Sequence, residues 1–173
     1  MKERLKIEVP GFSAEYNIEW FEDINFSNIE NIKQVYGILF NEDGELLIVN
    51  TVGNWQLPGG KPEGNEAWEE TGIRESIEEA DVEIKDLVPL GFQKVSEIKD
   101  GVELPSFHQI RFVAEIKKLN ELSIDPATGR IPKRKFINPE DFLKYCPWGE
   151  ISQHIINLAK EKRVNYDPAF SSK

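Results

Sequence analysis

The sequence predicts an α/β (α+β) fold in which a mixed β-sheet lies between helices. Several short segments alternate apolar and polar residues with the period of two expected for strands, most clearly residues 107–116. Two other segments, residues 66–79 and 151–159, have side chains that recur every three or four residues, as they do in helices. At 173 residues, one domain is expected, with enough chain to bury a core.

The first 31 residues predict a β-extension packed on the main domain. Residues 5–9 and 16–20 alternate in hydropathy around a turn at Pro10-Gly11, so a hairpin or two short strands is expected. Residues 22–31 are expected to be a polar loop. We expect the extension to cover an edge of the sheet. Two alternatives are that it pairs with a second subunit in a homodimer, or that it forms one wall of a substrate pocket.

The middle of the chain predicts the central strands. Apolar runs at residues 32–40 and 45–50 flank Asn41-Glu42-Asp43-Gly44, which indicates a hairpin. Residues 55–57 predict a short strand that leads into a pair of glycines.

Two longer strands follow the carboxylate-rich helix. Residues 87–95 predict a strand in which Pro89 indicates an edge or a bulge. Residues 107–116 predict a strand with one buried face. The residues of that face are Ile110, Phe112, Ala114 and Ile116.

The C-terminal third predicts a loop over residues 119–133, a strand at 134–137 and a helix that begins at Asn138-Pro139, because proline is favoured at the first helical position. A second amphipathic helix follows, and residues 163–173 are expected to form a tail. The apolar residues of the second helix are Ile151, Ile155, Ile156, Leu158 and Ala159.

The helix at residues 66–79, with Asn65 as the expected N-cap, carries the chemistry. Its side chains advance by about 100° per residue, so Glu75, Glu78 and Glu79 form one stripe. Ile73, Ile77 and Ala80 fall on the other side and are expected to face the core. Clustered carboxylates repel one another, and Mg²⁺, which prefers oxygen ligands and substrate phosphates, removes that cost. A glycine turn before a helix also favours the approach of an anion.

The segment from Gly60 to Val82 resembles the Nudix box, the signature of the Nudix hydrolase family. That signature is Gly, five residues, Glu, seven residues, Arg-Glu, an apolar residue, any residue, Glu-Glu, any residue, Gly and an apolar residue. The charged and first glycine positions match at Gly60, Glu66, Arg74, Glu75, Glu78 and Glu79. Ser76 stands where an apolar residue is usual. Asp81 replaces the last glycine, which leaves the turn at the helix end open, although Asp tolerates the left-handed conformation.

The resemblance implies a Nudix-like α/β/α sandwich over residues 32–162 and a Mg²⁺-dependent hydrolase, with Mn²⁺ as a substitute. The implied reaction cleaves the diphosphate linkage of a nucleoside diphosphate joined to another moiety. The implied catalytic residues are Arg74, Glu75, Glu78 and Glu79, and the implied metal ligands are Gly60, Glu75, Glu78 and Glu79. For Glu66 the resemblance implies one of two roles, bracing the turn before the helix or holding a further cation.

Two other functions remain as alternatives. Some Nudix domains bind a nucleotide metabolite without cleaving it and act as sensors. Others isomerise a diphosphate, which needs a cysteine in the cleft, whereas Cys146 lies beyond the last predicted strand and is expected to pack.

Several residues outside the box have weaker claims to a role. The candidates for a general base are Glu97, Asp100 and Glu103, for each of which a solvated role is favoured. His108 is expected to be a core histidine, and Lys133-Arg134-Lys135 to be solvated or to contact a distal phosphate. Trp55, Phe107 and Trp148 are expected to pack, with stacking on a base as the alternative. The box does not determine which group is joined to the diphosphate.

The composition of the chain limits its binding partners and its cellular compartment. The net charge of −10 argues against binding to polymeric nucleic acid or to anionic membranes, but not against a phosphorylated small molecule, because bound cations invert the local charge. The single cysteine excludes an internal disulfide and fits a reducing compartment. No apolar run has the length of a signal peptide or a membrane span. A cytoplasmic enzyme is expected.

Overall fold

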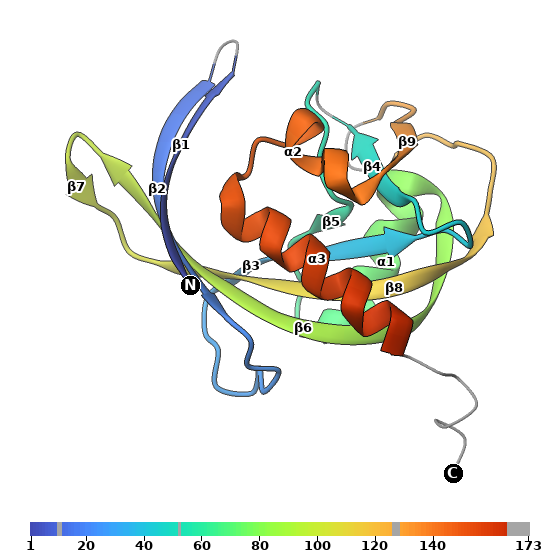
Figure 1. The fold of residues 1–173 in the computed structure, drawn as a ribbon, viewed down its shortest axis with the longest axis horizontal. Coiled ribbons are helices and arrows are strands. Elements are labelled where there is room, and N and C mark those ends of the chain that lie inside the picture. The colour runs from blue at the N-terminus through green and yellow to red at the C-terminus, as the bar shows by residue number, and fades with distance from the viewer. Residues whose placement is uncertain (10–11, 52, 126–128, 166–173) are drawn as a thin grey trace.

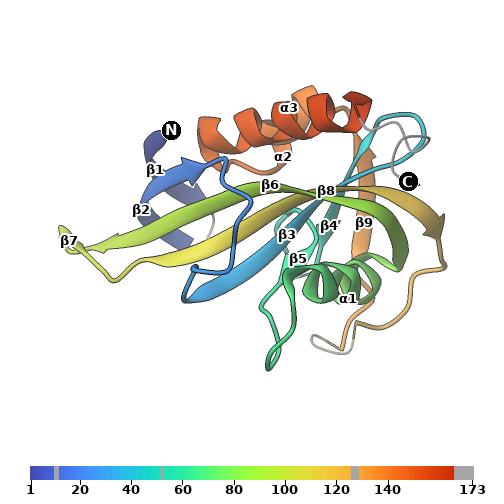
Figure 2. The same ribbon diagram turned by 90° about the horizontal axis from the view of Figure 1, so that it is seen from below.

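A computed structural model describes residues 1–9, 12–51, 53–125 and 129–165. Within them, one sheet lies between α1 (Trp68–Ala80) on one face and α3 (Gly149–Asn165), with the short α2 (Phe142–Tyr145), on the other. Figure 1 looks onto α3, and Figure 2 shows α3 above the sheet and α1 below it. The predicted α/β sandwich is therefore confirmed. The predicted turn at Pro10-Gly11 and the predicted tail after residue 165 fall outside the described residues.

The described strands form one nine-stranded mixed sheet. Its main path runs through β1 (Lys2–Val9), β2 (Phe12–Phe21), β6 (Val82–Lys99), β8 (Phe107–Leu119), β3 (Ile32–Phe40), β4 (Leu46–Asn50) and β9 (Lys133–Ile137). β5 (Gly59–Gly60) pairs with β3, and β7 (Val102–Glu103) pairs with β6. β3 and β8 are parallel, and the other pairs are antiparallel.

The predicted hairpin at Asn41–Gly44 is confirmed, but its two strands separate at once. The N–H of Asn41 donates to the carbonyl of Glu45, and Gly44 has a φ of 78°. Only Phe40 and Leu46 pair across the turn, after which β4 pairs with β9. The predicted strand at 55–57 is reduced to one bridge, between Gln56 and Val49.

β6 is longer than predicted and is not an edge strand. It begins at Val82, directly after α1, and lies between β2 and β8. Its pairing with β8 shifts register on both sides of Pro89. Pro89 therefore marks a bulge, one of the two predicted roles, because an inner strand tolerates a missing N–H only where the ladder is broken.

β8 is buried on both faces at its centre, so the prediction of a half-buried strand is wrong there. The five consecutive residues from Ile110 to Ala114 are all buried. Helices cover both faces of the sheet, and a strand in such a layer loses the alternation of exposed and buried residues.

The N-terminal extension forms the predicted hairpin and lengthens the sheet. β1 pairs with β2 along its length, and β2 pairs with β6. The hairpin is also fixed to α3, because the carboxylate of Glu3 accepts hydrogen bonds of 3.0 Å from the N–H groups of Glu150 and Ile151. These N–H groups belong to the first turn of α3 and have no partner inside the helix. β1 is an edge strand that carries Lys2, Arg4 and Lys6, and edge charges disfavour pairing with another chain.

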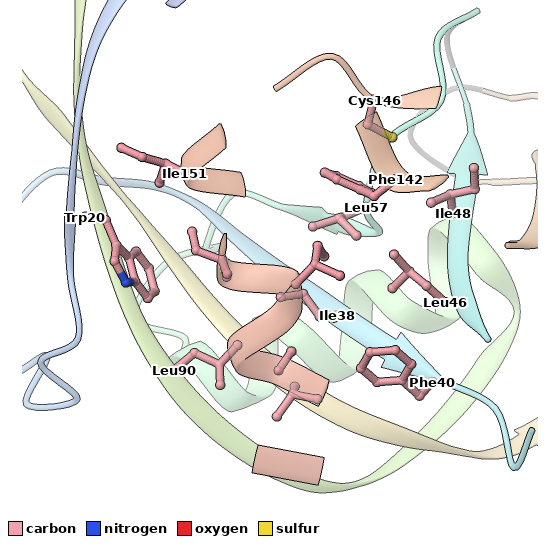
Figure 3. Close-up of a cluster of buried hydrophobic side chains, with 14 of the residues drawn as sticks. Trp20, Ile38, Phe40, Leu46, Ile48, Leu57, Leu90, Phe142, Cys146 and Ile151 are labelled. Carbon is pink, nitrogen blue, oxygen red and sulfur yellow. The ribbon is translucent and has the colours of Figure 1, made fainter. Parts of the chain in front are cut away.

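Two apolar cores hold the layers together. The larger one lies between the sheet and α2–α3, and Figure 3 shows Ile38, Leu57 and Phe142 meeting there beside Cys146. Ile151, Ile155, Ile156 and Ala159 face this core, which confirms the predicted apolar stripe of the C-terminal helix. α3 extends to Asn165, so residues 163–165 of the predicted tail are helical. The smaller core lies between the sheet and α1 and includes Ala80 and Phe112.

The face that α1 turns to the sheet differs from the prediction. Ile73 and Ile77 are 43% and 46% exposed, whereas Gly72, Ser76 and Ala80 are buried. A Cβ at Gly72 would lie 2.7 Å from the Phe112 ring, so only a small residue permits this close approach. Ser76, in place of the usual apolar residue, is accommodated because its hydroxyl donates to the carbonyl of Gly72 at 2.7 Å.

The start of α1 differs from the prediction, and its end settles a turn that the sequence left open. The N-cap is Ala67 and not Asn65, because the Glu70 carboxylate accepts a 2.8 Å hydrogen bond from the Ala67 N–H. At the other end, Asp81 adopts the left-handed conformation, with φ 51° and ψ 44°. Asp81 therefore takes the backbone role of the glycine that it replaces.

The start of the C-terminal region is as predicted. The side chain of Asn138 accepts a 3.0 Å hydrogen bond from Glu140, and Pro139 begins a 3-10 turn, η1 (Pro139–Asp141), that leads into α2. Among the described helices, none has both the length and the apolar character needed to cross a bilayer.

Candidate active site

A cleft of about 340 Å³ opens where the C-terminal half of α1 meets β5. Its lining includes all five residues predicted for the site, namely Gly60, Arg74, Glu75, Glu78 and Glu79. The helix delivers the last four because residues three and four apart share a face, and β5 brings Gly60 to the same place through its pairing with Val35.

Arg74 connects the carboxylates of this cleft. Its Nη1 donates to Glu75 at 2.7 Å and to Glu78 at 3.2 Å. Its Nε and Nη2 donate to the two oxygens of Glu66 at 2.8 and 2.9 Å, and Nη2 also donates to the carbonyl of Lys61 at 3.0 Å. A guanidinium has five N–H groups in a fixed plane, and these contacts use that number. Arg74 therefore fixes the loop before the helix and two of its glutamates together.

Glu66 braces the turn before the helix. Besides its bidentate pair with Arg74, it accepts hydrogen bonds from the Glu63 N–H at 2.9 Å and the Thr71 hydroxyl at 3.0 Å. These bonds, above all those from Arg74, lower the pKa of Glu66 to about 2. With its oxygens occupied in this way, Glu66 has the bracing role that was one of its two predicted roles.

Glu79 is the most deeply buried carboxylate of the stripe. Its Oε2 accepts a 2.9 Å hydrogen bond from the Gly59 N–H, and its Oε1 lies 3.5 Å from Nε2 of Gln56. Burial raises the pKa of Glu79 to about 7, against the effect of the Gly59 bond, and the charges of Glu75 and Asp125 add to the rise.

Glu75 lies directly against Gly60. A Cβ at Gly60 would be 1.9 Å from Oε1 of Glu75, so any other residue there would displace this carboxylate. Burial raises the pKa of Glu75, while the bond from Arg74 opposes the rise. The glycine is therefore needed for space, whatever its carbonyl binds.

Asp125 is a residue of the cleft that the sequence did not reveal. It is 2% exposed and lines the cleft with Glu75 and Glu79. It lies in an irregular segment, where no periodicity marks which side chains point inward. The segment is attached to the end of α1, because Asp81 accepts hydrogen bonds of 2.8 and 2.7 Å from the backbone and hydroxyl of Ser123.

Arg134 strengthens this attachment. Its guanidinium donates to the carbonyl of Ala80 at 2.7 Å and to that of Asn120 at 2.6 Å. It binds backbone at the end of the helix, where a cation is favoured by the helix dipole. Neither predicted role, a solvated residue or a distal phosphate contact, describes it.

The donor set of the cleft suits a hard divalent cation. All its charged donors are carboxylates, and mutual repulsion contributes to the raised pKa of Glu75 and Glu79. Among the residues that the structure describes, no three His, Cys, Asp or Glu side chains are arranged to hold a metal ion by themselves. Arg74 binds Glu75 and Glu78 instead. A set of carboxylate donors fits a hard cation such as Mg²⁺, which prefers oxygen ligands and also takes oxygens from water and from a substrate.

The other predicted candidates lie elsewhere. Glu97 and Glu103 are in β6 and β7, and Glu103 accepts a 2.9 Å bond from Asn17 of the N-terminal hairpin. Asp100 is in the turn between these strands. His108 is half-buried, and its Nδ1 lies 2.7 Å from the Glu30 carbonyl. None of them lines the cleft described above.

Cys146 and the aromatic residues pack, as predicted. Cys146 is fully buried, its thiol donates to the Trp55 carbonyl at 3.3 Å, and burial raises its pKa to about 12. Such a thiol is unsuited to catalysis, which needs the thiolate. Trp55 packs edge-on against Tyr145, and Trp148 packs against Tyr36 and Phe142.

Comparison with known proteins gives consistent results. Residues 31–158 match the family model of the NUDIX domain. A MutT-like protein of Streptomyces ambofaciens is 43% identical over 56 residues, which cover 26% of this chain and 36% of that protein. The match therefore spans about a third of the curated relative.

Solved structures resemble the fold. A mutant of the Bacillus subtilis pyrophosphohydrolase BsRppH superposes with a TM-score of 0.68 at 22% identity, over 85% of this chain and 92% of that one. A binary complex of an Ap4A hydrolase from C. elegans gives a TM-score of 0.55 at 14% identity, over 78% and 100% of the two chains.

Proposed function

This chain belongs to the Nudix family, and from that membership and the cleft of α1 we propose that it is a metal-dependent hydrolase of diphosphate linkages. The proposed substrate is a nucleoside diphosphate joined to another moiety. The observation that carries the proposal is the arrangement of Glu75, Glu78 and Glu79 in one cleft with Arg74. Proteins with a similar fold include a pyrophosphohydrolase and an Ap4A hydrolase, which agrees with this substrate class.

We assign the cation to Glu75, Glu78 and Glu79, with the carbonyl of Gly60 as a further oxygen ligand. The ion is Mg²⁺, with Mn²⁺ as a substitute, since carboxylates and carbonyls suit both. A divalent cation bound there neutralises the phosphate charge and lowers the pKa of water. In the reaction, a water oxygen bonds to one phosphorus, and the bond from that phosphorus to the bridging oxygen breaks.

The chain's own residues prepare the cleft for this reaction. Arg74 orients Glu75 and Glu78 by hydrogen bonds from one nitrogen. The Gly59 N–H fixes the rotamer of Glu79. Asp125 and Glu63 are carboxylates outside α1 that line the cleft, and we propose that one of them accepts the proton of the attacking water.

A panel of nucleoside triphosphates, nucleotide sugars and dinucleoside polyphosphates tests the proposal. With Mg²⁺ or Mn²⁺, we expect release of phosphate or of a nucleoside monophosphate from at least one of them. No turnover of any compound with either ion contradicts the hydrolase.

With Cys146 buried, a metabolite sensor is the remaining alternative to a hydrolase, and calorimetry separates these two functions. With a slowly hydrolysed nucleotide analogue, a hydrolase with these three glutamates is expected to bind more than one Mg²⁺ per site. One Mg²⁺, together with unchanged nucleotide after long incubation, favours the sensor.

A further inference from the structure

A second pocket, which we call the hairpin pocket, adjoins the cleft. It has a volume of about 190 Å³, and Tyr36 lines both spaces. One wall is formed by Leu5, Ile7, Tyr16 and Ile18 of the N-terminal hairpin. About six water molecules, at roughly 30 Å³ each in the liquid, would fill this volume. The pocket therefore has room for one ring system. The hairpin pocket is therefore a compartment beside the proposed diphosphate site.

The wall of this pocket lies outside the matched family domain. The NUDIX match begins at residue 31, whereas β1 and β2 end at Phe21. The wall is nevertheless held firmly, by the pairing of β2 with β6 and by the bonds from α3 to Glu3. A pocket built in this way is a feature of this chain that the family signature does not specify.

The lining of the pocket includes a buried arginine. Arg111 is 3% exposed, and its guanidinium lies 4.4 Å from the centre of the Tyr36 ring. Its Nη2 donates to Oε1 of Gln93 at 2.5 Å and to Oε1 of Gln109 at 2.8 Å. Within the part of the chain that the structure describes, no carboxylate pairs with it. Burying an arginine without a counter-charge is costly, so the arrangement needs a reason beyond packing.

Arg111 determines which way the two glutamine amides point. A guanidinium has donors only, so the atoms that it binds must be the carbonyl oxygens of Gln93 and Gln109. Each amide therefore directs its NH₂ group away from Arg111. Among the described residues, neither amide nitrogen donates a hydrogen bond, and both side chains line the pocket. The pocket consequently offers two N–H donors to whatever enters it.

The remaining lining suits a planar group. Trp148 and Phe107 line the same pocket as the two amides. Trp148 lies 5.3 Å from Tyr36, measured between ring centroids. Tyr36 also abuts the glycine turn of the cleft, because a Cβ at Gly59 would lie 2.7 Å from its Cδ1. A ligand with its phosphates in the cleft thus has an aromatic compartment next to it.

We propose that the hairpin pocket binds the nucleobase of the substrate, and that Gln93 and Gln109, oriented by Arg111, select a 6-oxopurine over adenine. Guanine and hypoxanthine present two adjacent acceptors, O6 and N7, to such a pair of donors. Adenine presents N7 and the N6 amino group, which is a donor and opposes one of the amides. This proposal rests on the proposed function for the place of the phosphates.

The test measures the binding of GMP, IMP and AMP to the metal-free protein by calorimetry. We expect GMP and IMP to bind at least about 10-fold more tightly than AMP, since one correct pair of hydrogen bonds discriminates by about 1–3 kcal/mol. The variants Gln93→Glu and Gln109→Glu keep the shape of the side chain and gain an ion pair with Arg111, but they lose the donor. Each is expected to abolish most of the preference. Gln153→Glu is the matched control, because Gln153 lies on α3 and its amide donates to the Pro139 carbonyl of η1.

The outcomes are distinct. AMP binding that equals or exceeds that of GMP in the wild-type protein overturns the proposal, as does the absence of binding by all three. A preference that survives in both Glu variants overturns the assignment to these residues. If the variants fail to fold, the comparison of GMP, IMP and AMP binding to the wild-type protein still tests the base preference. The assay involves no turnover, so a base preference without hydrolysis contradicts only the hydrolase, and hydrolysis without a base preference contradicts only the pocket.

Discussion

The backbone N–H of Gly59 donates a hydrogen bond of 2.9 Å to Oε2 of Glu79. This bond joins the glycine turn to the carboxylate that lies deepest among the three of the stripe. It holds Glu79 in one orientation while burial raises the pKa of that carboxyl to about 7. The turn and the helix are therefore joined directly before any ligand binds.

The pH dependence of stability tests the burial of Glu79. Its pKa is raised from 4.5 to about 7, so the folded state holds its proton more tightly than the unfolded chain. The metal-free protein should therefore lose stability as the pH rises from about 4.5 to 7, by about 3 kcal/mol at most from this group. Glu79→Gln removes this loss. Urea unfolding in EDTA at pH 5 and pH 8 measures it, and equal pH dependence in the two proteins contradicts the prediction.

Turnover tests the roles of the cleft carboxylates. Glu75→Gln and Glu79→Gln should each lower the rate by at least about 100-fold, because each removes a ligand charge whose effect is worth several kcal/mol. Neither variant should be less stable than the wild-type protein, since each substitution relieves repulsion, and Glu79→Gln should be more stable at pH 8 for the reason given above. Glu69→Gln, on an exposed position of the same helix, is the matched control. Near-wild-type turnover of either variant at limiting Mg²⁺ would show that its residue is wrongly assigned.

Arg74→Lys tests whether the planar guanidinium is required. Lysine keeps the charge but has three donors on one atom, so it cannot reach Glu66, Glu75, Glu78 and the Lys61 carbonyl together. We expect a loss of about 1–3 kcal/mol in unfolding free energy, because part of the network is left unpaired. Thermal unfolding measures it, with Lys61→Arg as a control that leaves the backbone carbonyl in place. A stability loss below the error of the measurement would mean that the network contributes little.

The packing of α1 predicts unequal losses of stability at two positions of the helix. Gly72→Ala raises helix propensity by about 1 kcal/mol, but its Cβ would lie 2.7 Å from the Phe112 ring. We expect net destabilisation of about 1–3 kcal/mol from overpacking. Ile77→Ala, at a side chain that is 46% exposed, should cost much less. Chemical denaturation measures both losses. A larger loss for Ile77→Ala than for Gly72→Ala would mean that Ile77 faces the core, as the sequence predicted.

Asp81 is expected to position Asp125. Asp81→Gly keeps the left-handed turn but removes both bonds to Ser123, whereas Asp81→Asn keeps one acceptor oxygen. Hydrogen exchange of residues 120–125 should accelerate in the glycine variant and less in the asparagine variant. The helix itself should exchange as before. Unchanged exchange in Asp81→Gly would show that Arg134 alone holds the segment.

Glu3→Gln tests the attachment of the N-terminal hairpin to α3. The neutral amide is a weaker acceptor and loses the attraction to the helix N-terminus, so we expect a loss of about 1 kcal/mol. Glu8→Gln, on the same strand and exposed, should have no measurable effect. A Tm of Glu3→Gln equal to that of the wild-type protein would mean that strand pairing alone fixes the hairpin.

Local patterns were enough to predict the fold class, and the match to the Nudix box gave five of the residues that line the cleft but not Asp125. The spacing of Glu75, Glu78 and Glu79 depends only on helix geometry. The hairpin at Asn41–Gly44, the turn at Asn138 and the apolar stripe of α3 are likewise short-range features. In each case the interacting residues lie within a few positions of one another in the chain.

What only the tertiary structure decided depends on contacts between distant segments. The side of α1 that faces the sheet was set by Phe112, which leaves room for Gly72 and Ser76 but not for Ile73 and Ile77. Asp125 entered the cleft because Asp81 and Arg134 hold its segment at the end of the helix. The amides of Gln93 and Gln109 are oriented by Arg111 of β8, which donates to the oxygens of both. Periodicity describes one element at a time, and these outcomes depend on which element packs against another.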